Sequence, residues 1–134
     1  MAASKADGQA EFVKQLKALG VDVSRETLAR LEAYAALLVK WQAKINLVGP
    51  ATLPDLWRRH FLDSAQLLPL LPSGPGILVD LGSGAGFPGL VLALMTEWRV
   101  HLVDSDQRKC AFLRQVALDT GVNARVAIHA QRFG

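Results

Sequence analysis

The chain falls into two parts that differ in the spacing of their apolar residues. From Gln9 to about Leu71, apolar side chains recur three or four positions apart, as they do along one face of a helix. Gly20 is a favourable end for the first helix, and Ser24 is a favourable N-cap for the second. The first apolar stripe consists of Phe12, Leu16 and Leu19, and the second of Leu28, Leu31, Ala35, Leu38 and either Trp41 or Gln42.

A third helix is expected after the break at residues 46–50. Thr52 is a suitable N-cap, and Pro54 and Asp55 are both favoured in a first turn. The helix should bury one apolar stripe and end at the prolines of residues 69–72. The members of that stripe are Leu56, Phe61, Leu62, Ala65 and Leu68.

The periodicity changes after the proline- and glycine-rich residues 72–76. Short apolar runs predict strands, and these alternate with helical patterns, which is typical of βαβ units in a parallel sheet. The expected strands are 77–81, 100–104 and 124–129, and the expected helices are 87–95 and 106–120. The pattern therefore predicts an N-terminal helical segment over residues 1–72 and the first half of an α/β domain over residues 73–134.

The composition limits which partners, cysteine sites and cellular locations are expected for this chain. The 134 residues are 51% hydrophobic, so the chain can bury a core, and its net charge of +3 permits an anionic partner such as RNA without requiring one. The single cysteine, Cys110, excludes an internal disulfide, and with only three histidines no zinc site is expected. We expect Cys110 to be a packed thiol. No signal peptide or membrane-spanning stretch is evident, which favours a soluble cytoplasmic protein.

The candidate chemistry lies in the glycine-rich run Asp80-Leu-Gly82-Ser-Gly84-Ala-Gly86, between an expected strand and an expected helix. Glycines allow positive φ and close approach of a ligand to the backbone. A dinucleotide fingerprint needs a small residue where Phe87 stands, and a P-loop needs a lysine that is missing. An acid two residues before Gly-x-Gly-x-Gly is instead typical of class I methyltransferases, whose donor, S-adenosylmethionine, carries no phosphate. Asp80 would help to hold the amine of the donor, directly or through water.

Asp104 ends the second expected strand, 22 residues after Gly82. An acid at this place can accept hydrogen bonds from both hydroxyls of a ribose. The alternative is that Asp104 is the N-cap of the helix that follows. We favour ribose binding.

Four motifs together resemble the glucose-inhibited division protein B family, also known as ribosomal RNA small-subunit methyltransferase G. The resemblance extends from about Leu28 to the end of the chain. The motifs are Trp41-Gln-Ala-Lys-Ile-Asn46-Leu, Arg59-His60-Phe-Leu-Asp63-Ser64, Asp80-Leu-Gly-Ser-Gly-Ala-Gly-Phe-Pro-Gly89, and Asp104-Ser105 followed by Arg108-Lys109 and Phe112-Leu113.

The resemblance implies a Rossmann-like, class I methyltransferase fold and methylation of N7 of a guanine in 16S ribosomal RNA, with S-adenosylmethionine as donor. It also implies the small ribosomal subunit as partner and donor contacts at Gly82, Phe87, Gln131 and Arg132. The final segment departs from the family, which usually has Arg-x-Glu where this chain reads Ala130-Gln-Arg-Phe-Gly134. An acid that could accept from the adenine amine is therefore missing.

No catalytic acid or base is expected, because N7 of guanine already carries a free lone pair and alignment suffices. His60 beside Asp63 fits a structural role or an RNA contact better than proton transfer. Six basic residues could bind phosphates or simply be solvated: Lys40, Lys44, Arg58, Arg59, Arg108 and Lys109. We expect the three tryptophans, Trp41, Trp57 and Trp98, to fill core or interface positions.

Three strands supply one wall of a methyltransferase crevice and leave residues 77–79 as an open apolar edge. We therefore expect the chain to be part of a longer monomeric enzyme, and to bind the donor weakly and methylate no RNA by itself. Two rivals remain at this point. One is a nicotinamide-dependent oxidoreductase, which Phe87 disfavours, and the other is a degenerate module that binds RNA or a partner without activity.

Overall fold

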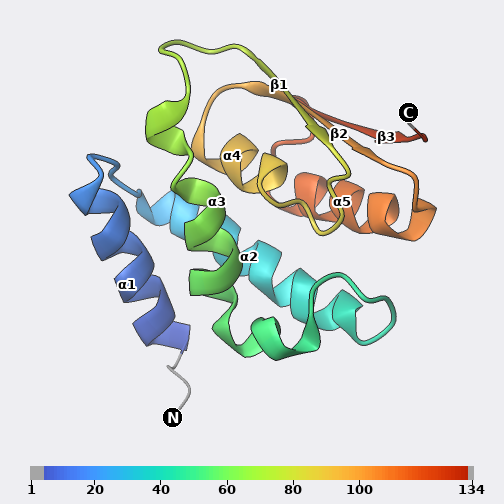
Figure 1. Cartoon of the computed structure of the whole chain (residues 1–134), viewed down its shortest axis with the longest axis horizontal. Helices are drawn as coiled ribbons and strands as arrows, with labels where there is room; N and C mark the ends of the chain where they lie inside the picture. The colour runs from blue at the N-terminus through green and yellow to red at the C-terminus, as the bar shows by residue number, and fades with distance from the viewer. Residues whose placement is uncertain (1–4, 133–134) are drawn as a thin grey trace.

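The computed structural model describes residues 5–132, which form a three-stranded sheet with helices packed on one face (Figure 1). The main helices and strands, in chain order, are α1 (Lys5–Ala18), α2 (Arg25–Gln42), α3 (Asp63–Ala65), β1 (Ile77–Leu81), α4 (Gly89–Met95), β2 (Arg99–Asp104), α5 (Gln107–Asp119) and β3 (Val126–Ala130). The α/β alternation predicted from the apolar periodicity is confirmed.

The three strands are parallel and lie in the order β1-β2-β3, so β1 is an edge strand of the described sheet. Leu81 pairs with Val103, and Asp104 pairs with Ala130. The register therefore places the ends of all three strands side by side. The loops that follow β1, β2 and β3 meet at this carboxyl edge.

Only one face of the described sheet is covered. Helices α4 and α5 lie on the same side of the strands in Figure 1, and Val100 and Leu102 of β2 are buried beneath them. On the other side Ile77, Val79 and Leu81 of β1 are 57–66% exposed. Alternation along a strand explains the difference, since successive side chains point to opposite faces.

The N-terminal helical segment, described from residue 5 to residue 72 and called here the helical front, packs against α4 and α5. Ser24 is the N-cap of α2, as predicted, because its hydroxyl oxygen accepts a hydrogen bond from the Thr27 backbone N–H at 3.1 Å. The buried face of α2 contacts α4 and α5, and α1 contacts the turn at residues 57–62. Buried residues of the front and of the α/β part form one continuous hydrophobic cluster.

The prediction of a single third helix capped by Thr52 is wrong. Residues 50–55 form a 3-10 helix, residues 57–62 form a wider π-helical turn, and only α3 is α-helical. Pro50 and Pro54 lack the backbone N–H that a regular ladder needs. The Thr52 hydroxyl donates to the Gly49 carbonyl at 2.8 Å instead of capping a helix.

Two element boundaries also shift. The helix expected from residue 87 begins at Gly89, because Phe87 and Pro88 still belong to the loop. The strand expected from residue 124 begins at Val126, because the Arg125 N–H bonds to Val122 in a turn. No helix within residues 5–132 is both long and apolar enough to cross a membrane.

Candidate functional site

The glycine-rich loop joins β1 to α4 at the carboxyl edge of the sheet. Gly82, Gly84 and Gly86 have φ values of +76°, +55° and +99°, a region that residues with a side chain rarely adopt. The backbone N–H groups of Gly82 and Ser83 donate to the Val103 carbonyl of β2, at 2.8 and 3.1 Å. The loop is therefore tied to the strand that carries Asp104.

Asp104 lies directly beside this loop. Its Oδ2 accepts a hydrogen bond from the Gly84 N–H at 2.9 Å, and its Oδ1 accepts one from the Asp106 N–H at 2.8 Å. The N-cap of α5 is Asp106, whose carboxylate accepts from the N–H groups of Arg108 and Lys109. The N-cap alternative for Asp104 is therefore wrong, and its carboxylate connects the two loops at the sheet edge.

The sequence-predicted residues after β3 come to the same edge. The Gln131 N–H donates to the Asp104 carbonyl at 3.0 Å, and Arg132 follows with an exposed side chain. Phe133 and Gly134, the last part of the segment that departs from the family pattern, lie outside the described residues. Candidate residues from all three strand ends thus lie close together.

Asp80 lies beneath the start of α4, where its Oδ2 accepts from the Gly89 N–H at 3.0 Å. Burial raises the pKa of Asp80 above its ordinary value, and the nearby Asp104 carboxylate adds to the rise. The hydrogen bonds from Gly89 and Ser83 act against this rise. A Cβ on Gly89 would lie 2.7 Å from Asp80 Oδ2, so only glycine permits this approach. One carboxylate oxygen of Asp80 therefore has a structural role.

The loop is held from its other side by Tyr34 of α2. The fully buried Tyr34 hydroxyl donates to the Ala85 carbonyl, and the Tyr34 ring lies nearly parallel to Phe87, with centroids 5.6 Å apart. Burial raises the pKa of Tyr34 well above its ordinary value, and Asp80 adds to the rise. A Cβ on Gly86 would collide with the Tyr34 hydroxyl and lie 2.9 Å from Leu90 Cβ. The helical front therefore shapes the glycine loop.

His60 packs on the same phenylalanine. Its ring lies nearly parallel to Phe87, with centroids 4.9 Å apart, and its Nε2 is 2.7 Å from the Thr52 hydroxyl oxygen. Burial lowers the pKa of His60, as does the Arg59 guanidinium, whereas Asp63 raises it. The His60 ring supports the loop through Phe87, which agrees with the structural role expected of this residue.

A family model described as rRNA small subunit methyltransferase G matches residues 27–132, which include the glycine loop, Asp104 and Gln131. The chain belongs to the rRNA small subunit methyltransferase G family. The matched region contains α2 as well as the sheet, so Tyr34 and its contact with the loop lie inside it.

Curated relatives carry the same description, ribosomal RNA small subunit methyltransferase G. The protein from Paramagnetospirillum magneticum is 74% identical over 95 residues, which cover 71% of this chain and 46% of the relative. That from Rhodospirillum rubrum is 62% identical over 116 residues, which cover 87% and 57%, and that from Rhodospirillum centenum is 66% identical over 110 residues, which cover 82% and 50%. The chain spans about half the length of these relatives.

The sequence analysis did not predict that Tyr34 of α2 would hold the glycine-rich loop of this rRNA small subunit methyltransferase G family member. A signal was present, because Tyr34 lies three residues after the buried Leu31 on α2 and a buried hydroxyl needs a partner. The identity of that partner could not be read from the sequence, since Ala85 is 51 residues away.

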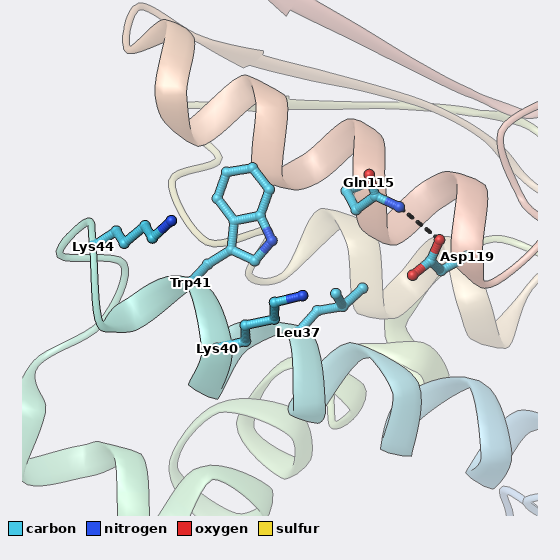
Figure 2. Close-up of a pocket in the computed structure, with 6 residues that line it drawn as sticks. All are labelled: Leu37, Lys40, Trp41, Lys44, Gln115 and Asp119. Carbon is cyan, nitrogen blue, oxygen red and sulfur yellow. Dashed lines mark hydrogen bonds between the residues drawn. The ribbon is translucent and has the colours of Figure 1, made fainter.

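The basic candidates that the structure describes in most detail have different surroundings. Arg58 is engaged by Asp55, whose Oδ2 is 2.8 Å from Arg58 Nε, whereas Lys40 and Lys44 line a groove between α2 and α5 (Figure 2). Trp57 is buried, as expected of a filling residue, whereas Trp41 packs edge-on against Phe112 and remains partly exposed. Cys110 is also buried, as expected.

Proposed function

We propose that the chain supplies the donor-binding loop and acid of an enzyme that methylates N7 of a guanine in 16S ribosomal RNA, using S-adenosylmethionine. The observation that carries the proposal is the carboxylate of Asp104, held against the Gly84 N–H at the end of β2. This arrangement occurs in a chain of the rRNA small subunit methyltransferase G family. Such an enzyme would act in the cytoplasm, where ribosomal subunits are assembled.

The residues at the edge of the sheet fit the donor chemically. A carboxylate has about four acceptor sites. The N–H groups of Gly84 and Asp106 use two of those of Asp104, which leaves acceptors for two ribose hydroxyls. A Cβ on Gly84 would meet nothing closer than the Gly82 carbonyl at 4.0 Å, so the loop offers open backbone to a ligand.

We assign the other donor contacts by their place around Asp104. Gly82 and Gly84 would pass beneath the ribose and the methionine tail, and the free acceptor sites of Asp80 would face the amine, directly or through water. Phe87 would supply an apolar wall. Gln131 and Arg132 follow β3 on the side of Asp104 away from the glycine loop, where the adenine would lie.

Methyl transfer to guanine N7 requires mainly that the protein align the donor with the guanine. When bound, S-adenosylmethionine supplies an electrophilic methyl group on a sulfonium, and guanine N7 accepts it without losing a proton. The residues of this chain bind and orient the donor and exclude water from it. His60 need not transfer a proton, which agrees with its engagement by Thr52 and Phe87.

Ligand-induced thermal stabilisation tests donor binding against the nicotinamide alternative. We expect S-adenosylhomocysteine to raise the melting temperature of the chain and NAD to leave it unchanged, because Phe87 blocks the close helix approach of a dinucleotide loop. Equal stabilisation by NAD would contradict the proposal. Failure of S-adenosylhomocysteine to bind at any concentration would favour the degenerate module instead.

Methyl transfer needs a separate measurement. The chain, and a chimera that continues after Arg132 with the remaining sequence of the Paramagnetospirillum magneticum relative, would each be expressed in bacteria that lack their own family member. Mass spectrometry of the 16S ribosomal RNA would measure 7-methylguanosine. We expect the chimera to restore the modification, and we expect Asp104→Ala to abolish that restoration. A well-expressed chimera that leaves the guanine unmodified would refute the proposed reaction.

A further inference from the structure

A groove of about 510 Å³ lies between α2 and α5. We call it the α2–α5 groove. The close-up in Figure 2 shows its lining side chains converging from both helices. They are Leu37, Lys40, Trp41, Lys44, Gln115 and Asp119.

The groove has a cationic wall. Lys40 lies in the last turn of α2 and Lys44 in the turn that follows the helix, and both line the groove. Both are exposed, and within residues 5–132 neither forms a salt bridge. The one acid of the lining, Asp119, is engaged by Gln115, whose Nε2 donates to it at 2.7 Å. The neutral amide leaves the charge of Asp119 in place, so the lining carries two ammonium groups and one carboxylate and has an excess of positive charge.

An aromatic ring stands between the two helices. Trp41 packs edge-on against Phe112 of α5, with ring centroids 5.7 Å apart, and remains partly exposed in the groove. Cations beside a partly exposed indole are the combination that binds single-stranded nucleic acid, since phosphates pair with the cations and a base stacks on the ring. An acidic peptide would satisfy the lysines but would leave the indole without a matching flat group.

The groove also lies within reach of the donor site. Helix α5 follows its N-cap Asp106, whose N–H donates to Asp104, and passes Phe112 before reaching Gln115. At about 1.5 Å per residue, the distance along the helix from Asp106 to Gln115 is about 14 Å. A bound strand could therefore run from the groove to the carboxyl edge of the sheet within a few nucleotides.

We propose that the α2–α5 groove binds a single-stranded segment of RNA that flanks the target guanine. Its phosphates pair with Lys40 and Lys44, and one of its bases stacks on Trp41. This inference rests on the proposed function for the identity of the RNA, but it concerns a surface separate from the donor site.

Charge reversal tests the cationic wall. Lys40→Glu with Lys44→Glu would be compared with Lys14→Glu and Lys17→Glu, two exposed lysines of α1 that give the same change in net charge. Fluorescence anisotropy would measure the affinity of the chain for a labelled single-stranded 16S fragment across a salt series. Each lost phosphate contact should reduce the salt slope by about 0.7, so the groove pair should reduce it by about 1.4 and weaken binding more than the control pair. Equal weakening by both pairs would overturn the proposal.

Tryptophan fluorescence tests the base contact. RNA should quench the emission of the wild-type chain, and Trp41→Phe should remove most of that quenching while keeping an aromatic ring against Phe112. Trp98→Phe is the matched control, and it should leave the quenching in place. Quenching that survives in Trp41→Phe would refute the base contact.

Binding of S-adenosylhomocysteine, measured on the same variants, separates the two proposals. If the donor analogue binds every variant and the groove pair leaves RNA affinity unchanged, the groove proposal fails and the proposed function stands. If the analogue binds neither the wild type nor any variant, the proposed function fails whatever the RNA measurements give.

Discussion

Two loops meet at the carboxyl edge of the sheet, and they are held in different ways. The β2–α5 turn is held mainly by its own residues, because Asp104 and Asp106 accept hydrogen bonds from the N–H groups of residues 106, 108 and 109, with one further bond from Gly84 of the other loop. The β1–α4 loop depends on a residue far away in the sequence, since Tyr34 of α2 binds Ala85 and lies against Gly86 and Phe87. The proposed donor site thus combines an acid held mainly by its own turn with a glycine loop that the helical front must hold in shape.

This difference has a consequence for substitutions. A change in the β2–α5 turn should act mainly on ligand binding, because the neighbouring backbone can hold its shape. A change in the β1–α4 loop should first act on folding, because the loop lies between the sheet and α2 and belongs to the hydrophobic cluster that joins both parts. Substitutions in the two loops should therefore separate loss of stability from loss of donor affinity.

The largest effect is expected from Gly86→Ala. The new methyl group would collide with the Tyr34 hydroxyl at a φ of +99°, which combines overpacking with backbone strain. We expect a loss of about 2–4 kcal/mol in the free energy of unfolding, measured by denaturant titration.

Gly121→Ala is the matched control for this variant. Gly121 also has a positive φ, +76°, but a Cβ there would meet no atom within 4 Å. It should therefore cost only the backbone strain, about 1–2 kcal/mol. Equal losses in the two variants would mean that α2 does not constrain the glycine loop.

Asp104→Ala should mainly affect ligand binding. It removes the acceptor for the ribose hydroxyls, and each hydrogen bond to a charged group is worth about 1.5–3 kcal/mol, so affinity for S-adenosylhomocysteine should fall on the order of tenfold or more. The Gly84 and Asp106 N–H groups lose their partner too, which should lower stability by about 1–2 kcal/mol. Calorimetric titration measures the affinity.

Asp106→Ala serves as the control for Asp104→Ala, because it removes a carboxylate only two residues away. Asp106 caps α5 and is bound by Arg108 and Lys109 N–H groups, so its loss should weaken the start of the helix. Donor affinity should stay as in the wild type. An Asp104→Ala chain that binds the analogue as tightly as Asp106→Ala would remove the basis for the ribose assignment.

Tyr34→Phe should have a moderate effect that depends on the neighbouring glycine. Loss of the hydrogen bond to Ala85 should cost about 1 kcal/mol in the free energy of unfolding. In the Gly86→Ala background the same change removes the atom that the new methyl meets, so it should cost less or even stabilise. A double-mutant cycle by denaturant titration measures this coupling. Additive losses would show that the hydroxyl and position 86 do not interact.

The features that the sequence predicted correctly depend on residues close together in the chain. Alternating apolar runs predicted the strands and crossover helices, and the spacing from Gly82 to Asp104 brought the acid and the loop together, as the Gly84 contact confirms. What it missed rests on packing between distant segments. Tyr34 finds its partner 51 residues away, and the π-helical turn at residues 57–62 follows a proline-interrupted stretch that an apolar stripe alone could not resolve. All the donor contacts remain predictions: Asp80, Gly82, Gly84, Phe87, Asp104, Gln131 and Arg132.

The smallest effect is expected from Asp80→Asn, and it is a change in the pH dependence of stability. Burial raises the pKa of Asp80, so the folded chain binds a proton at this group more tightly than the unfolded chain does. The resulting stabilisation is present at acidic pH and is lost as the pH rises through the raised pKa, above the ordinary aspartate range. Asparagine cannot titrate but can still accept from the Gly89 N–H.

The advantage of wild type over Asp80→Asn should therefore shrink as pH rises from acidic to neutral, by less than about 1 kcal/mol because the group is only half-buried. Denaturant midpoints across this range measure the trend, with Asp119→Asn on the exposed side of α5 as the control for removing a charge. Curves for wild type and Asp80→Asn that stay parallel would contradict a buried carboxylate beneath α4. A converging pair would support the structural role of Asp80, whose carboxylate accepts from the Gly89 N–H beneath α4.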